Sequence, residues 1–141
     1  IKDSFILKKT SEQISAVMTP KIQGAWNLDQ ATKAEELDFM LLFSSISGCM
    51  GNLGQADYAG ANAFLDAFAS HRNQAVAARQ GYGKTVSINW PLWQDGGMQI
   101  AQSSIDWLFN QTGMSPLSTR VGVEMFFQAL IQTGYDVLLV C

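Results

Sequence analysis

Residues 37–67 read LDFMLLFSSISGCMGNLGQADYAGANAFLDA. The segment 37–45 is a continuous apolar run that ends in two hydroxyl side chains, which predicts a strand buried on both faces, as in a parallel sheet. The glycine-rich segment 48–54 is predicted as a loop. A long helix over residues 55–80 follows, and the glycines just after it are expected to end it. Strand, loop and helix in this order favour an α/β fold.

The predicted helix carries two polar side chains on one face. Tyr58 and Asn62 are four residues apart, so their polar tips lie one above the other on the helix surface. Two interpretations are open at this point. The phenol and the amide either decorate a packing face or face a reacting group.

The rest of the chain alternates between helical and strand patterns. Thr10 and Gln13 resemble a capping box, so a helix is expected to begin near Ser11. Pro20 then either interrupts this helix or opens a second one. The later elements are predicted as a strand at 85–90, a loop at 92–98, helices at 103–112 and 120–133, and a last strand at 136–140.

Strands that alternate with helices predict an α/β fold, a Rossmann-like parallel sheet with flanking helices, of which about three strands are present. A complete dinucleotide-binding domain opens with a strand, a G-x-G-x-x-G loop and a helix. The glycines Gly48, Gly51 and Gly54 lack that spacing. Residues 1–141 are therefore expected to be the second half of such a fold, excerpted from a longer polypeptide whose N-terminal nucleotide-binding half is absent.

Composition excludes several classes of function. The formal net charge of the 141 residues is −3, which argues against nucleic acid as a partner because a basic surface would be needed. No apolar run reaches the eighteen or more residues of a membrane-spanning helix. Cys49 and Cys141 are too far apart in sequence to suggest a disulfide framework or a metal site. These features predict a cytoplasmic protein that binds neither nucleic acid nor membrane.

Polar residues from several elements are expected to meet at one edge of the sheet. Ligands of open parallel sheets bind outside the carboxyl ends of the strands, where Ser45 and the segment 89–93 end the two predicted strands. Tyr58 and Lys21 begin the neighbouring helices. This set suits hydride transfer to a ketone: a tyrosine donates the proton, a lysine stabilises the negative charge, and a serine holds the carbonyl oxygen. Asn62 could orient Lys21 or a relay water.

These residues carry a family resemblance. The segment FSSISGCMGNLGQADYAGANAFLDA strongly resembles the ketoreductase domain of modular polyketide synthases, a branch of the short-chain dehydrogenase/reductase superfamily. Ser45 stands thirteen residues before Tyr58, and Asn62 stands four after it. The segment TPKIQGAWNL resembles the family segment with the catalytic lysine, here Lys21. Most short-chain dehydrogenases have the lysine and asparagine positions exchanged, which decides against a stand-alone member of the superfamily.

The resemblance implies a function for the chain. In the family, NADPH reduces a β-ketoacyl thioester on an acyl carrier protein, among neighbouring synthase domains, in polyketide and antibiotic biosynthesis. It implies a catalytic set and two groups of binding residues. The catalytic residues would be Lys21, Ser45, Tyr58 and Asn62, the cofactor-binding residues Trp90, Pro91 and Leu92, and the substrate-binding residues Asp3, Gln55, Trp93 and Met98. A mobile substrate lid is expected at about 94–118.

The first residues suggest a stereochemical class. The segment IKD, residues 1–3, falls where ketoreductases that yield the D-configured alcohol (B-type) carry Leu-Asp-Asp, with Asp3 as the last aspartate. The other class has a tryptophan in the loop before the tyrosine, and residues 48–57 contain none. The resemblance therefore favours B-type, although Lys2 departs from the motif.

A second hypothesis of a different class is that the chain is a non-catalytic structural or docking half of a reductase-like domain in a multidomain synthase. Such a half would usually have lost its catalytic residues. This chain retains all four, which argues for the enzyme. The isolated excerpt is nevertheless expected to be inactive.

Overall fold

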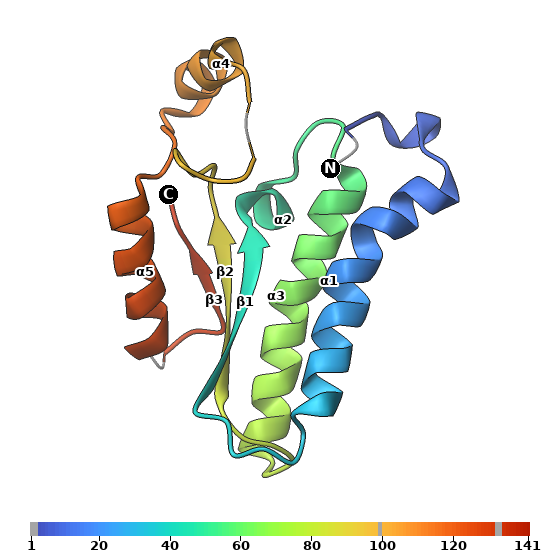
Figure 1. Cartoon of the computed structure of the whole chain (residues 1–141), viewed down its shortest axis with the longest axis vertical. Coiled ribbons are helices and arrows are strands. Elements are labelled where there is room, and N and C mark those ends of the chain that lie inside the picture. Colours follow the sequence, from blue (N-terminus) through green and yellow to red (C-terminus); the bar gives the residue numbers. More distant parts are fainter. Residues whose placement is uncertain (1–2, 99, 132–133) are drawn as a thin grey trace.

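Three parallel strands form the centre of the chain, in the order β1-β2-β3 (Figure 1). The computed structural model describes residues 3–98, 100–131 and 134–141. The strands are β1 (Phe39–Ser45), β2 (Lys84–Trp90) and β3 (Val137–Leu139). Ser45 pairs with Trp90, so β1 and β2 end side by side at the same edge of the sheet. The predicted strands and the parallel sheet are confirmed.

Helices cover the sheet on both faces (Figure 1). On one face lie α1 (Ser11–Ala31) and α3 (Ala56–Ala77), and on the other lies α5 (Thr119–Ile131). Three shorter helices lie near the carboxyl ends of the strands or before α1: η1 (Ile6–Lys8), α2 (Ile46–Met50) and α4 (Gln102–Thr112). The core is correspondingly divided into two clusters. One contains Ala25, Met40, Leu42, Leu65, Phe68 and Ala69, and the other contains Val86, Ile88, Trp90, Ala129 and Val140.

The prediction that β1 is buried on both faces is wrong. Met40 and Leu42 are buried beneath α1 and α3, whereas Phe39 and Phe43 on the opposite face are 48% and 52% exposed. On that face the described part of the chain supplies one helix, α5, which packs over β2. A continuous apolar run indicates where a strand lies, and the elements that cover each face decide its burial.

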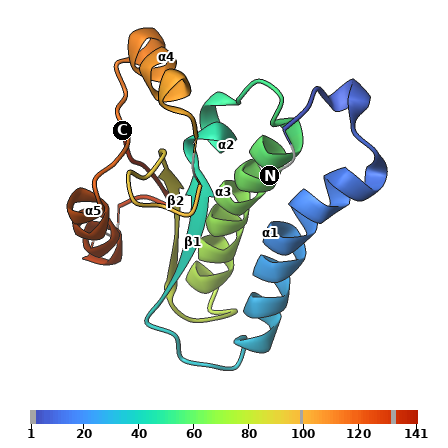
Figure 2. The same cartoon turned by 45° about the horizontal axis from the view of Figure 1, so that its top comes forward.

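Pro20 neither ends α1 nor opens a second helix. The helix continues from Ser11 to Ala31, and its predicted capping box between Thr10 and Gln13 is confirmed. Proline removes one backbone hydrogen bond from the interior of a helix and favours a bend. Figures 1 and 2 show α1 changing direction within its first half, so that its first turns lead away from α3.

The predicted glycine loop is partly helical. Directly after β1, the chain forms the short helix α2, capped by the Ser45 side chain, which accepts a hydrogen bond from the Ser47 amide. Gly48 allows α2 to contact α3, because a Cβ at Gly48 would lie 2.9 Å from the amide nitrogen of Ala63. The loop is thereby shortened, and α3 begins close to the carboxyl end of β1.

The interface between α3 and β2 is polar although it is buried. Asp66 on α3 accepts hydrogen bonds from Ser87 Oγ at 2.6 Å and from Asn89 Nδ2 at 3.0 Å. Further along, Arg72 Nη1 donates to Thr85 Oγ1 at 2.9 Å. Buried hydrogen bonds are directional and are costly to leave unmade. They therefore fix the position of α3 along the sheet, and with it the position of Tyr58.

Candidate active site

A cavity of about 750 Å³ opens at the carboxyl ends of β1 and β2. Lys21 of α1, Ser45 at the end of β1 and Tyr58 in the first turn of α3 all line it. These three elements are formed by separate segments of the chain, and the fold brings their side chains to one place. This is the location that the open parallel sheet favours for a ligand.

Lys21 is half-buried and reaches into the cavity between β1 and Tyr58. Its Nζ donates a hydrogen bond to the Phe43 carbonyl oxygen at 2.7 Å and lies 6.0 Å from the centroid of the Tyr58 ring. Burial of the ammonium lowers the pKa of Lys21 from its ordinary value, and the negative charge of Asp66 partly opposes this. The side chain thus places a poorly hydrated cation next to a phenol.

Ser45 has a hydroxyl hydrogen available for a ligand. Its Oγ accepts hydrogen bonds from the Ser47 amide at 3.3 Å and from Ser47 Oγ at 3.1 Å. Both described bonds use the oxygen as an acceptor, and a hydroxyl also donates one hydrogen bond. That hydrogen can serve a carbonyl oxygen in the cavity.

Asn62 lies beneath Tyr58 and does not line the cavity. Its Nδ2 donates a hydrogen bond to the backbone carbonyl of Tyr58 at 2.8 Å. The backbone carbonyl of Asn62 accepts a hydrogen bond from Ser44 Oγ at 3.1 Å. The Asn62 side chain is fully buried, and its Oδ1 has no hydrogen-bond partner among the residues that the structure describes. The two residues on this helix face therefore differ in position: Tyr58 lines the cavity, and Asn62 supports the backbone of Tyr58.

The seven residues predicted to bind cofactor or substrate also line the cavity: Trp90, Pro91, Leu92, Asp3, Gln55, Trp93 and Met98. Gln55 is held between two neighbours, since its Nε2 donates to Asp3 Oδ2 at 2.9 Å and its Oε1 accepts from Asn52 Nδ2 at 2.9 Å. Of the segment IKD, only Asp3 belongs to the described residues. Its carboxylate therefore lies at the cavity wall, linked to the start of α3.

The segment predicted as a lid leaves the sheet and returns to it at one point. Leu117 N donates to Leu92 O at 2.7 Å, and Gln94 N donates to Leu117 O at 2.8 Å. The residues between these two contacts include α4, which lies beyond the carboxyl ends of β1 and β2 (Figure 2). Gln99, within the predicted lid, lies outside the described residues.

Sequence reasoning missed the contribution of α4 to the cavity wall. Ser104, Trp107 and Leu108 line the cavity, and none of them is among the site residues that the sequence predicts. Their spacing of three and four residues places them on one helix face. That spacing is the signal that would have identified them.

Comparison with known proteins identifies the family. The model of the KR domain family matches residues 1–95. The chain belongs to the KR domain family. This ketoreductase (KR) chain is 45% identical over 130 residues to polyketide synthase PksN of Bacillus subtilis (strain 168), covering 92% of this chain and 2% of PksN. It is 48% identical over 127 residues to polyketide synthase PksL of the same organism, covering 90% of this chain and 3% of PksL.

A solved structure agrees with the fold of this KR chain. A ketoreductase domain from the bacillaene assembly line superposes with a TM-score of 0.93 at 43% identity. The match covers 98% of this chain and 33% of that one. The chain thus spans a third of the solved chain and only 2–3% of the length of the two synthases. Its fold is that of the short-chain dehydrogenase/reductase superfamily.

No helix in the described ranges is both long and apolar enough to cross a bilayer.

Proposed function

We propose that this chain is the catalytic half of a ketoreductase domain that reduces a β-ketoacyl thioester to the β-hydroxyacyl thioester. The substrate is carried on an acyl carrier protein, NADPH is the reductant, and other synthase domains are the neighbours. The observation that carries the proposal is that Lys21, Ser45 and Tyr58 line one cavity at the carboxyl ends of β1 and β2.

Each of these side chains suits one part of the reaction. When bound, the nicotinamide cofactor supplies a hydride to the carbonyl carbon. The Ser45 hydroxyl donates a hydrogen bond to the carbonyl oxygen, on which negative charge develops. The Tyr58 phenol transfers its proton to that oxygen, and the Lys21 ammonium stabilises the phenolate that remains. Asn62 holds the backbone of Tyr58 from below.

The residues present fit a nicotinamide group. Trp90, Pro91 and Leu92 form an apolar wall of the cavity. Trp90 Nε1 is buried and has no hydrogen-bond partner in the described part of the chain, so a bound carboxamide could accept its N–H. These three residues would hold the nicotinamide end of the cofactor. The phosphates would be bound by the N-terminal half of the domain.

The stereochemical outcome that we propose is the D-configured alcohol. Its basis is the resemblance of residues 1–3 to the Leu-Asp-Asp motif. The contact between Asp3 Oδ2 and Gln55 Nε2 at the cavity wall supports a role for this segment in orienting substrate.

The direct test is a reduction assay on the complete ketoreductase domain that contains this chain. With a β-ketobutyryl thioester of N-acetylcysteamine, we expect NADPH to be consumed at least about tenfold faster than NADH at equal concentration, because a dedicated 2′-phosphate contact is worth about 1.4 kcal/mol or more. Chiral chromatography should give the D-hydroxy product. Absence of reduction by a domain that binds NADPH would contradict the proposal, and an L-configured product would contradict the B-type assignment alone.

Residues 1–141 in isolation should self-associate and should not reduce ketones. Within the described residues, β1 pairs with β2 on one edge only. Phe39 and Phe43 on one of its faces are about half-exposed, although Phe43 also packs against Trp90 and Phe126. An open edge beside apolar side chains favours pairing with another chain. Size-exclusion chromatography with light scattering is expected to give oligomers or aggregates. A monodisperse monomer with cooperative melting near that of the complete domain would refute this expectation.

A further inference from the structure

A buried ion pair joins the starts of the two helices that carry Lys21 and Tyr58. Lys9 Nζ lies 2.5 Å from Asp57 Oδ1, and each side chain is only 1% exposed. Lys9 directly precedes the residue that caps α1, and Asp57 lies in the first turn of α3, next to Tyr58. Neither residue lines the cavity, and the steps proposed above do not use them.

The Asp57 carboxylate also holds the backbone of Tyr58. Asp57 Oδ1 accepts a hydrogen bond from the Tyr58 amide at 2.9 Å. Burial would raise the pKa of Asp57, but the hydrogen bonds from Lys9 and Tyr58 and the charge of Lys9 keep the pKa below its usual value. One carboxylate oxygen thus connects the residue before α1 to the backbone of Tyr58.

The segment before α1 is fastened to the start of α3 at two further points. Ser4 N donates to Gly54 O at 2.9 Å, and Gln55 Nε2 donates to Asp3 Oδ2 at 2.9 Å. The ion pair is the third and most buried of these links. The ion pair therefore holds the end of the segment 3–9 against α3, and Asp3 of this segment forms part of the cavity wall.

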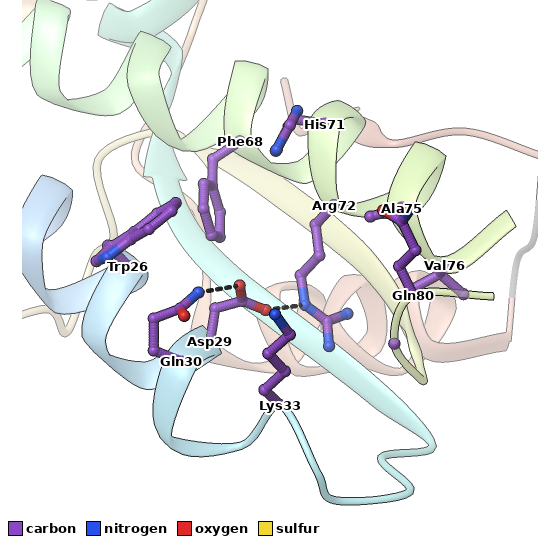
Figure 3. A pocket seen from close by; sticks show the side chains of 11 residues that line it. Trp26, Asp29, Gln30, Lys33, Phe68, His71, Arg72, Ala75, Val76 and Gln80 are labelled. Atoms are coloured by element: carbon purple, nitrogen blue, oxygen red, sulfur yellow. Dashed lines mark hydrogen bonds and ion pairs between the residues drawn. The ribbon is translucent and has the colours of Figure 1, made fainter. Parts of the chain in front are cut away.

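A second ion pair joins the same helices away from the cavity. Arg72 Nε of α3 lies 2.7 Å from Asp29 Oδ1 of α1, and Figure 3 shows the two side chains meeting beside a small hollow of about 200 Å³. Since α1 and α3 run side by side (Figure 1), an ion pair fastens them at each end. The Asp29 pair provides a matched control for the Lys9 pair.

We propose that Lys9 and Asp57 are positioning residues that set the Tyr58 phenol relative to Lys21. This inference rests on the proposed function of the cavity. A buried charge pair tolerates little displacement, because any opening leaves charges that water cannot reach. Proton transfer requires the phenol and the carbonyl oxygen to be within hydrogen-bond distance, and a displacement of about 1 Å can cost 10²-fold in rate. The pair provides this precision without touching the substrate.

The test compares variants of the complete domain at a temperature below the melting point of each. Lys9→Met and Asp57→Asn should lower kcat about 10- to 100-fold with KM changed by less than about threefold. Asp29→Asn should lower Tm by some degrees and leave kcat within about twofold of the wild type. Because a single substitution can prevent folding, the double variant Lys9→Met/Asp57→Leu removes both charges and should recover most of the lost Tm.

The double variant separates alignment from stability. We expect its kcat to stay at least about tenfold below that of the wild type. A leucine at position 57 cannot accept the hydrogen bond that the Tyr58 amide donates to Asp57. Wild-type kcat in the double variant, or a loss in Asp29→Asn as large as in Lys9→Met, would overturn the positioning role. A wild-type domain that reduces no ketone would instead contradict the proposed function.

Discussion

Replacing Tyr58 with phenylalanine is expected to lower kcat for ketone reduction at least about 10³-fold while the domain stays folded. The substitution keeps the aromatic ring that Lys21 contacts and removes only the phenolic hydroxyl. General acid catalysis typically contributes 10²–10⁴-fold, and no second acid is proposed at the carbonyl oxygen. The effect is measured by reducing a β-ketoacyl thioester and monitoring the reaction through the loss of NADPH absorbance.

The control is Tyr82→Phe, which removes a phenolic hydroxyl from a tyrosine that is 50% exposed and does not line the cavity. Its kcat should match that of the wild type. Circular dichroism and NADPH affinity should be unchanged in both variants. Full turnover in Tyr58→Phe would refute the role of Tyr58 as the acid. A wild-type domain without turnover would instead favour the hypothesis of a non-catalytic structural half.

Much of the candidate site could be predicted because its residues follow local patterns. Ser45 ends an apolar strand, and Tyr58 begins a long helix soon after it, so both had to lie at the carboxyl edge of a parallel sheet. Lys21 lies on the preceding helix, whose start is marked by the capping box at Thr10. In each case a short segment of sequence determines both the element and the end at which the residue lies.

Burial could not be predicted in the same way, because it depends on neighbours distant in sequence. Phe43 is as apolar as Leu42, yet one is half-exposed and the other is buried. The difference arises from α1 and α3, which cover one face of β1, while α5 packs over β2 on the other. Pro20 is similar, since the packing of α1 against α3 retains a helix that local propensity would interrupt.

The Lys9–Asp57 pair shows the same limit. The two residues are 48 positions apart, and each one alone resembles an ordinary surface charge at the start of a helix. They meet because the segment 3–9 lies against the start of α3, where Ser4 contacts Gly54 and Asp3 contacts Gln55. Nothing in the spacing of the sequence encodes this contact, whereas the spacing of Tyr58 and Asn62 is fixed by the helix itself.

Lys21→Met is expected to lower kcat about 10²-fold or more without lowering the stability of the domain. The loss of activity follows because an ammonium that stabilises the phenolate is removed, and a single electrostatic group of this kind contributes 10²–10³-fold. Stability should be retained because burial lowers the pKa of Lys21, which means that folding disfavours the charged form. Methionine fills the space without that charge, so Tm at neutral pH should equal or exceed that of the wild type.

The pH dependence of Tm tests the cause of this difference. Below the folded-state pKa of Lys21, the lysine is charged in both the folded and unfolded states, and the full cost of burying the ammonium is present. As pH rises from the folded-state pKa toward 10.5, the ordinary value, the unfolded chain binds more protons, so wild-type stability rises relative to the variant. The advantage of Lys21→Met in Tm should therefore shrink with rising pH, and Lys33→Met, at an exposed lysine near the end of α1, should show no such trend.

A Tm of Lys21→Met that is several degrees below the wild type at neutral pH would contradict the account, because the ammonium would then be a stabilising group. Retained Tm with lost turnover would indicate that the site keeps a buried charge for catalysis at the expense of stability.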